Sequence, residues 1–494
     1  MSYFKINLFC KQSYFMYILG LNHGEINSSA ALYHDGEIIA AAPEERFNRI
    51  KRTKSFPKHS VQFCLDFANI KLKDVDIIVQ AWYPGAGWIK YNPLISGSRI
   101  KREDYFYTVP DNLFNLTERT DHDWIMMSLD NNGLPPIYYL KHHRSHAANA
   151  FYLSPFEKAA ILTCDFKGEF ETTTMGLGKG NEIVTLEKMF MPHSLGVLYS
   201  SFTELLGYQA DNDEWKVMAL SAFDIDCSFH LEKIKSTYKL LDNGLIELDL
   251  NYYKAAILDQ PSLYTEKLVK LLGGRTGIAG EDPDQWHYSI ARAMQIAFEE
   301  IAIHMLNNLY ERTKLKNVVL GGGSFMNSVF NGKVIEKTQF ENVYISHSPS
   351  DVGNSIGAAL YVAHHLKNED RSTKFNSSYL GPSFSDEEIK KTLEGKKIVY
   401  EKIENIPKTV ADILSRGEII ARFNESMEFG ERALGNRSIL ADPRDKNIKD
   451  KINSVIKYRE SYRPFAPVVT QENVCDYFDV SETFTCNYME KVVQ

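Results

Sequence analysis

Two histidines four residues apart, His142 and His146, have the spacing of a metal-binding pair. Residues at this spacing lie one above the other on a single helix face, and the small residues in 145–150 are compatible with a helix. The apolar run 159–164 predicts a strand, and Asp165 follows directly at its end. Two imidazoles and one carboxylate form a known type of metal site with open coordination positions. The sequence therefore predicts a metal centre at these three residues.

The same residues have plainer explanations. A histidine pair with this spacing is not by itself specific for metal. A fourth candidate ligand, Asp351, follows the predicted strand 343–345 and precedes the small-residue helix 358–364. A carboxylate in that position equally fits a helix N-cap, so we predict Asp351 as a ligand with this alternative open.

The elements around these residues repeat. Asp35-Gly36, between two alternating runs, is a strong hairpin signal. Two copies of three short strands separated by polar turns suggest a duplicated α/β domain, although two unrelated hairpins are the alternative. The strands are expected at 17–21, 28–33 and 37–42, and again at 159–164, 172–177 and 183–189.

Polar turns in the two copies and a glycine loop are candidate nucleotide contacts. In a duplicated fold of this kind the two turns face each other across a cleft and offer backbone N–H groups to phosphate. The loop 321–323 consists of three glycines between strand 317–320 and a helix, and glycine lets a nucleotide approach the backbone. Many strand–helix connections contain glycine, so the loop alone is not specific. The residues predicted at these sites are Ser28, Ser29, Gly168, Gly322 and Gly323.

A run rich in arginine and glycine, 428–438, follows a polar boundary near 367–383. Arg432 and Arg437 lie in this run, and Arg463 comes later. Guanidinium groups capture phosphate through paired hydrogen bonds, so we predict phosphate binding here. A solvated basic surface is the alternative, but these arginines alternate with apolar residues. The elements expected around them are helices at 386–393 and 408–416 and strands at 397–402 and 418–423.

Composition excludes several classes of protein. The 494 residues suffice for two or three domains, and a net charge of −8 gives no electrostatic basis for wholesale nucleic-acid binding. The six cysteines show no C-x-x-C spacing, which favours a reduced, cytoplasmic protein over a disulfide framework or a zinc knuckle. No apolar run reaches the about 18 residues of a membrane span. Residues 1–15 are expected to be an irregular extension that precedes the fold.

Several motifs, in one order, resemble those of the O-carbamoyltransferases of nodulation-factor and antibiotic biosynthesis. The most specific lies in 428–467, where the runs 432–438 and 463–467 match the family. The other matching segments are 44–47 with Lys51, His142-His143 with His146, Asp165 with Gly168, 194–199, 216–220 and 321–327.

The resemblance implies a duplicated actin-like, sugar-kinase-like α/β domain over 16–370, followed by a YrdC-like α/β domain over 380–494. It implies that the second domain makes carbamoyl-adenylate from carbamoyl phosphate and ATP, and that the first passes the carbamoyl group to a hydroxyl. The acceptor would be a small metabolite, a sugar or a hydroxymethylated nucleobase.

The resemblance also implies roles for single residues. Lys51 and the loop of Gly322 and Asn327 would hold the adenylate. The metal would be iron, as Fe(II), and its ligands would be His142, His146, Asp165 and Asp351. The phosphate-binding residues of the second domain would be Arg432, Arg437 and Arg463.

Three features depart from the family pattern. Ile26-Asn27 stands where the family usually has His-Asp, and Phe166 replaces the usual glycine after Asp165. The chain also stops before the family's closing elements. We therefore expect an incomplete second domain, which a second chain would complete, and a homodimer is also compatible with the sequence.

The missing family histidine leaves the general base open. His23 is our candidate, because it lies in a nearby polar turn that points toward the same cleft. A surface turn histidine is the alternative. Two other functions also remain compatible with the sequence: an actin-like small-molecule kinase or ATPase, and a non-catalytic homologue that binds or scaffolds.

Overall fold

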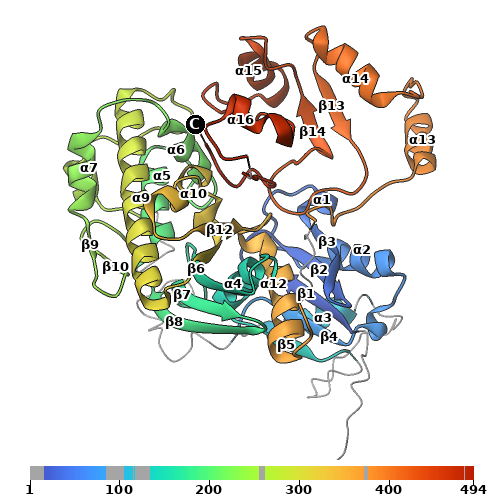
Figure 1. Ribbon diagram of the computed structural model, residues 1–494, viewed down its shortest axis with the longest axis horizontal. Helices are drawn as coiled ribbons and strands as arrows, with labels where there is room; N and C mark the ends of the chain where they lie inside the picture. Colours follow the sequence, from blue (N-terminus) through green and yellow to red (C-terminus); the bar gives the residue numbers. More distant parts are fainter. Residues whose placement is uncertain are drawn as a thin grey trace, which may run out of the picture.

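The structure is a computed structural model, and it describes residues 16–84, 105–114, 116, 134–254, 262–371, 377–482 and 484–493. The extension expected at 1–15 lies outside the described residues. Two five-stranded mixed sheets form the larger part, and a smaller C-terminal region lies above them in Figure 1. Among the described residues, no helix is both long and apolar enough to cross a membrane.

The first sheet has the strand order β3-β2-β1-β4-β5. The first three strands pair antiparallel, whereas β4 runs parallel to β1 and β5 parallel to β4. The turn between β2 and β3 has positive φ at Asp35 and Gly36, as the tight hairpin expected there requires. The strands are β1 (Tyr17–Asn22), β2 (Ser29–His34), β3 (Glu37–Pro43), β4 (Ile77–Gln80) and β5 (Ile137–Tyr139).

The second sheet repeats this topology. Its order is β12-β11-β6-β7-β8, with β6, β7 and β8 antiparallel, β11 parallel to β6, and β12 parallel to β11. The predicted duplication is therefore confirmed by strand order and direction. The strands are β6 (Lys158–Cys164), β7 (Glu171–Lys179), β8 (Glu182–Phe190), β11 (Asn317–Gly321) and β12 (Asn342–Ile345).

Two central helices, α4 (His142–Tyr152) and α12 (Asn354–Leu360), pack against each other between the sheets (Figure 1). The approach is close: a Cβ added at Gly357 would lie 2.0 Å from the Ser145 carbonyl oxygen. Alanines of both helices share one apolar cluster with β1 and β6. Small side chains thus allow these helices to bring the ends of both sheets together.

The remaining helices cover the outer faces. The long helix α9 (Gln285–Thr313) lies against the second sheet, and Asp284 caps it by accepting the Trp286 N–H at 3.0 Å. The other elements of this part are α1 (Glu45–Asn48), α2 (Lys58–Ala68), α3 (Tyr105–Phe114), α5 (Leu195–Leu205), α6 (Glu214–Leu220), α7 (Ser228–Lys235), β9 (Tyr238–Leu240), β10 (Ile246–Leu248), α8 (Glu266–Leu271), α10 (Ser328–Asn331) and α11 (Val334–Lys337).

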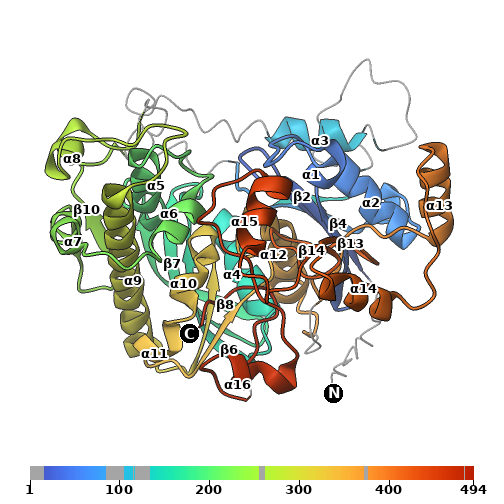
Figure 2. The ribbon, with the colours of Figure 1, turned by 90° about the horizontal axis from the view of Figure 1, so that it is seen from above.

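The C-terminal region has a two-stranded antiparallel sheet of β13 (Ile420–Phe423) and β14 (Arg437–Leu440). In the view from above, β14 and α15 project over α12 (Figure 2). The strand expected at 397–402 is wrong: this run pairs with no strand in the described chain, and Val399 is 98% exposed. Its β-branched residues have no sheet to join. The helices are α13 (Asp386–Gly395), α14 (Ile406–Ser415), α15 (Ile448–Lys451) and α16 (Val474–Tyr477).

Candidate metal centre

The helix that carries both histidines, α4, is held at its N-terminus by a buried carboxylate. The Glu169 oxygens accept the His142 backbone N–H at 3.1 and 3.2 Å, and one of them also accepts the Tyr83 N–H at 2.8 Å. The first N–H groups of a helix lack partners within the helix, and this end carries partial positive charge. The carboxylate therefore fixes the turn from which His142 projects.

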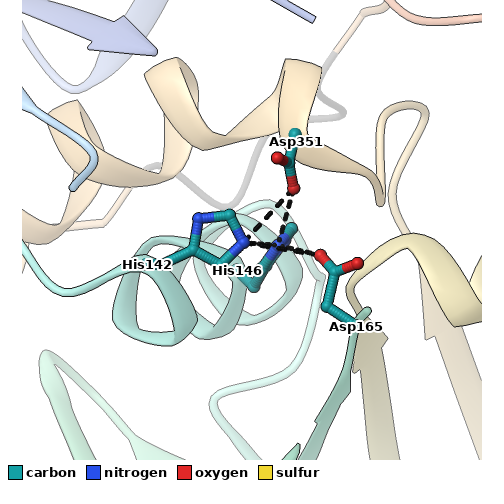
Figure 3. Close-up of side chains that lie close together, drawn as sticks. All are labelled: His142, His146, Asp165 and Asp351. Atoms are coloured by element: carbon teal, nitrogen blue, oxygen red, sulfur yellow. Dashed lines mark hydrogen bonds and ion pairs between the residues drawn. The ribbon is translucent and has the colours of Figure 1, made fainter. Parts of the chain in front are cut away.

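The four predicted ligands converge on one point (Figure 3). His146 Nε2 lies 2.9 Å from His142 Nε2 and 2.7 Å from Asp165 Oδ2. Asp351 Oδ1 lies 3.2 Å from His142 Nε2 and 3.3 Å from His146 Nε2. One atom of each residue lies within 4.8 Å of the others. Both histidine side chains are fully buried.

This donor set fits a metal ion. Two imidazole nitrogens and two carboxylate oxygens face one another. Only one proton can lie in the hydrogen bond between His142 Nε2 and His146 Nε2, which are 2.9 Å apart. A buried carboxylate needs a counter-charge, and a divalent cation meets all four donors at once. Two histidines and two carboxylates leave coordination positions open for substrate.

The electrostatics of the cluster favour a positive charge at this point. Although burial opposes the charged imidazole, the carboxylates of Asp351 and Asp165 raise the pKa of His142 to about 10. His143, the next residue, points elsewhere: its Nδ1 lies 2.8 Å from Thr163 Oγ1, and burial lowers its pKa to about 3. At His143, burial and the charges of His142 and His146 outweigh the carboxylate of Asp165, which raises the pKa.

Two further side chains position the histidines. The Trp82 ring stacks on the His142 ring with centroids 3.9 Å apart. The Asn354 Nδ2 atom, at the start of α12, lies 3.2 Å from His146 Nε2 and 3.4 Å from His142 Nδ1. Outer contacts of this kind orient metal ligands. Neither residue is recognisable from the sequence, because both reach the site only through the packing of separate elements.

The glycine loop passes over the end of β6, directly beside a ligand. Gly322 has φ +97°, and a Cβ there would lie 2.1 Å from the Cys164 carbonyl oxygen. A Cβ at Gly323 would lie 3.1 Å from Asp165 Oδ1. Close packing on Cys164 and Asp165 thus explains both glycines, and their contact with a nucleotide stays a prediction.

The other residues predicted to contact nucleotide are mostly engaged within the protein. Ser29 Oγ donates to the Val352 carbonyl at 2.8 Å, and the Gly168 N–H closes its own turn at 2.7 Å. Asn327 Oδ1 caps α10 by accepting an N–H at 3.1 Å. Ser28 is buried, and its hydroxyl has no hydrogen-bond partner in the described part of the chain.

His23 follows β1, beside the neighbouring parallel strand β4. Its Nδ1 lies 3.0 Å from Gln80 Oε1, and its ring meets Phe56 edge-on at 5.2 Å. His23 is only 5% exposed, which excludes the alternative of a solvent-exposed turn histidine. Burial lowers its pKa to about 4, so the ring is neutral near pH 7. Trp82, two residues after Gln80, stacks on His142, so the strand that contacts His23 also leads to the histidine cluster.

Lys51 and Arg463, far apart in the sequence, belong to one basic cluster. The Arg463 guanidinium lies 3.6 Å from the Trp215 ring centroid, and burial together with Arg459 lowers the pKa of Arg463 to about 10. Burial lowers the pKa of Lys457, and the charges of Arg459, Arg463 and Lys51 lower it further. Cations that destabilise one another in this way favour an anion between them.

Arg437 is anchored within its own segment. Its Nε donates to Glu428 Oε2 at 2.8 Å and its Nη2 to the Glu428 carbonyl at 3.1 Å. Arg437 also lines a cavity of about 310 Å³ between α1 and the β13–β14 sheet. Arg432 lies on the same turn and is half-buried. The other basic residues that line the cavity are Arg46, Arg49 and Arg422.

Asp211 is a further acidic group near the centre that sequence analysis did not assign. It forms an ion pair with Arg52 at 3.3 Å. Loss of surrounding water raises the pKa of Asp211, Arg52 opposes this, and Asp165 and Asp351 raise it further. Its place in the charged stretch 211–216 was a signal, but nothing local distinguished it from a solvated surface.

Comparison with known proteins identifies two matching family models. The model described as Carbamoyltransferase N-terminus matches residues 17–360. The model described as Carbamoyltransferase C-terminus matches residues 411–494. The first match includes all four residues of the metal cluster, and the second includes the arginine-rich segment.

Three relatives illustrate the similarity. An uncharacterised protein of Synechocystis is 36% identical over 490 residues, which cover 94% of this chain and 77% of that protein. Nodulation protein NolNO of Sinorhizobium fredii is 32% identical over 92% of this chain and 64% of its own length. A 3'-hydroxymethylcephem-O-carbamoyltransferase of Streptomyces clavuligerus is 25% identical over 68% of this chain and 60% of its own. The chain thus spans about three fifths of the length of the latter two proteins.

Proposed function

Because this chain belongs to the carbamoyltransferase family, we propose that it transfers a carbamoyl group from carbamoyl phosphate to a hydroxyl group of an acceptor. The observation that carries the proposal is the buried cluster of two histidines and two aspartates within the segment that matches the family's N-terminal model. One relative is named for a hydroxymethyl acceptor, which supports a primary alcohol on a small metabolite, a sugar or a hydroxymethylated nucleobase.

The reaction proceeds, in this proposal, through carbamoyl-adenylate. Water first cleaves carbamoyl phosphate to carbamate and phosphate. A carbamate oxygen then attacks the α-phosphorus of ATP, which forms carbamoyl-adenylate and releases pyrophosphate. Two groups of cations support polyphosphate binding: the arginines that line the cavity beside Arg437, and the cluster of Lys51, Lys457 and Arg463. A single guanidinium group can bind a phosphate through two parallel hydrogen bonds.

The cluster at α4 is the proposed transfer site. A divalent metal there, for which we propose Fe(II), supplies Lewis-acid polarisation of the carbamoyl carbonyl or of the leaving phosphate. His142 and His146 would hold it from one helix face, and Asp165 and Asp351 would complete the set of ligands from two separate segments. The Trp82 ring, stacked on His142, restricts rotation of the His142 imidazole. The mixed anhydride carries a good leaving group, so the remaining requirement is removal of the acceptor proton.

His23 is the proposed base for that proton. Its ring is neutral near pH 7 and can therefore accept a proton. It contacts Gln80, two residues before Trp82, whose ring stacks on His142. We expect His23→Gln to lower carbamoyl transfer by about 10²-fold or more, the size typical of lost acid–base help. Transfer would be measured from pre-formed carbamoyl-adenylate, and pyrophosphate release from ATP would be measured separately.

A matched control for His23→Gln is His365→Gln, at a half-buried histidine next to α12 whose Nδ1 contacts the Asn181 carbonyl at 3.3 Å. This variant should transfer normally. Pyrophosphate release should continue in both proteins. Normal transfer by His23→Gln would remove His23 from the reaction.

The proposed function is tested by incubating the chain with isotopically labelled carbamoyl phosphate, ATP and a panel of acceptor alcohols. We expect a product heavier by one labelled carbamoyl group, together with AMP, pyrophosphate and phosphate, identified by mass spectrometry. An actin-like kinase would instead release ADP and phosphorylate the acceptor. A phosphorylated product, or no turnover with metal-loaded protein on any acceptor, would contradict the proposal.

A further inference from the structure

The loop that delivers the ligand Asp351 is held by the metal-bearing helix itself. Asn149 of α4 donates from Nδ2 to the Ser348 carbonyl at 2.6 Å and to Ser346 Oγ at 3.1 Å. Ser346, Ser348 and Ser350 are all buried. The segment between β12 and Asp351 therefore runs through the interior, and its position fixes that of the ligand.

A second set of contacts to this loop comes from the C-terminal region. Phe429 is buried in the apolar cluster that includes α4 and α12, and its ring meets the His347 ring edge-on at 5.9 Å. Gly430 has φ +106°, and a Cβ there would lie 2.5 Å from the His347 carbonyl oxygen. Only glycine permits this approach. Residues more than 80 positions apart in the chain are thus packed backbone to backbone.

Glu431 extends this contact to the residue before the ligand. Its carboxylate accepts a hydrogen bond from the hydroxyl of the buried Ser350. Glu431 itself is exposed, so the bond reaches from the surface into the loop. Three residues earlier, buried Glu428 binds the Arg437 guanidinium at 2.8 Å. A continuous series of contacts therefore joins the arginine-rich turn to the metal ligand.

We propose that Glu431 is a positioning residue for Asp351: by holding Ser350, it keeps the carboxylate aimed at the two histidines. The C-terminal region thereby contributes to the metal affinity of a site whose ligands all belong to the other region. This inference rests on the proposed function, because it requires a metal at the cluster. Outer contacts that orient metal ligands typically change metal affinity by about 10–100-fold.

The test is calorimetric titration of Co²⁺ into the metal-free 494-residue chain. We expect Glu431→Ala to weaken Co²⁺ binding about 10-fold, and Ser350→Ala to do the same. The double variant should be no weaker than either single variant, because both remove one contact. Glu431→Gln keeps an accepting oxygen and should restore most of the affinity. Since Glu431 is exposed, its removal leaves no cavity that could unfold the protein.

Glu425→Ala is the matched control, because Glu425 is exposed on the same segment and no described contact joins it to the Asp351 loop. Unchanged Co²⁺ affinity in Glu431→Ala, or additive losses in the double variant, would overturn the inference. The variant His146→Ala distinguishes failure of the positioning role of Glu431 from failure of the metal site itself. If that variant still binds Co²⁺ normally, the metal site itself is wrong; if it does not and Glu431→Ala binds normally, only the positioning role fails.

Discussion

His146→Ala should abolish metal binding and lower carbamoyl transfer by on the order of 10³-fold, the equivalent of several kcal/mol of lost transition-state stabilisation. His146 Nε2 makes the shortest approach in the cluster, 2.7 Å to Asp165, and it also faces His142 and Asp351. Its removal leaves an incomplete donor set. The measurement is metal content after anaerobic loading with Fe²⁺, alongside transfer from carbamoyl-adenylate.

The fold should survive this change. Alanine is the best helix former, and α4 already carries alanines at 147, 148 and 150. His143→Asn is the matched control, because His143 is a buried histidine on the same helix that contacts Thr163 and not the carboxylates. The far-ultraviolet circular dichroism of both variants should match the unchanged chain. Full transfer activity in metal-free His146→Ala would show that the cluster has no part in the reaction.

Glu428→Ala should destabilise the arginine-rich turn at 428–438. The buried Glu428 carboxylate accepts the backbone N–H groups of Leu434 and Asn436 at 2.7 and 2.9 Å and the Arg437 Nε–H at 2.8 Å. Alanine leaves these donors unpaired and Arg437 without its counter-charge. We expect a cost of about 3 kcal/mol, at the low end for a broken buried ion pair because Arg437 is partly exposed.

Amide hydrogen exchange across 428–437, read by mass spectrometry, measures this cost locally. Protection should fall by about 10²-fold, as about 3 kcal/mol implies. Glu428→Gln keeps one accepting oxygen and should lose much less. Pyrophosphate release should fall with protection in the alanine variant. Unchanged exchange would show that the turn is held by other contacts.

The stabilisation of 428–437 by the Glu428 carboxylate also depends on pH. Burial opposes ionisation of Glu428, but the N–H donors and Arg437 hold its pKa below the usual value. A carboxylate whose folded-state pKa is depressed stabilises the fold fully above its unfolded-state pKa of about 4.3. The stabilisation is lost as the pH falls through the lower folded-state pKa. Exchange rates in 428–437, corrected for intrinsic pH effects, should therefore rise in acid.

Local pattern was sufficient for much of the architecture. The Asp35-Gly36 hairpin and the repeated order of strands and turns follow from side-chain alternation and turn chemistry, which act over a few residues. The histidine pair on one helix face and the aspartate at a strand end are local features of the same kind. The duplicated topology and three of the converging ligands were therefore predictable before any tertiary contact was known.

What the pattern could not decide were partners far apart in the chain. From the sequence, Asp351 could equally be a helix cap, and only the packing of α12 on α4 placed it 3.2 Å from His142. Glu169, which holds the start of α4, is an unremarkable turn residue in the sequence. Arg437 was expected to be available for phosphate, but part of its hydrogen-bonding capacity goes to Glu428.

The strand expected at 397–402 failed for a related reason: local composition does not reveal whether a pairing strand is present. Its β-branched residues have the composition of a strand, but a strand forms only where another offers hydrogen bonds, and none of the described strands lies beside it. The sequence by itself determined the elements whose stability is local and the residue types able to bind a metal. Tertiary structure alone decided which elements pair, which carboxylates meet the histidines, and that Glu431 of the C-terminal region reaches the residue next to Asp351, because those contacts depend on close packing between segments that no local periodicity relates.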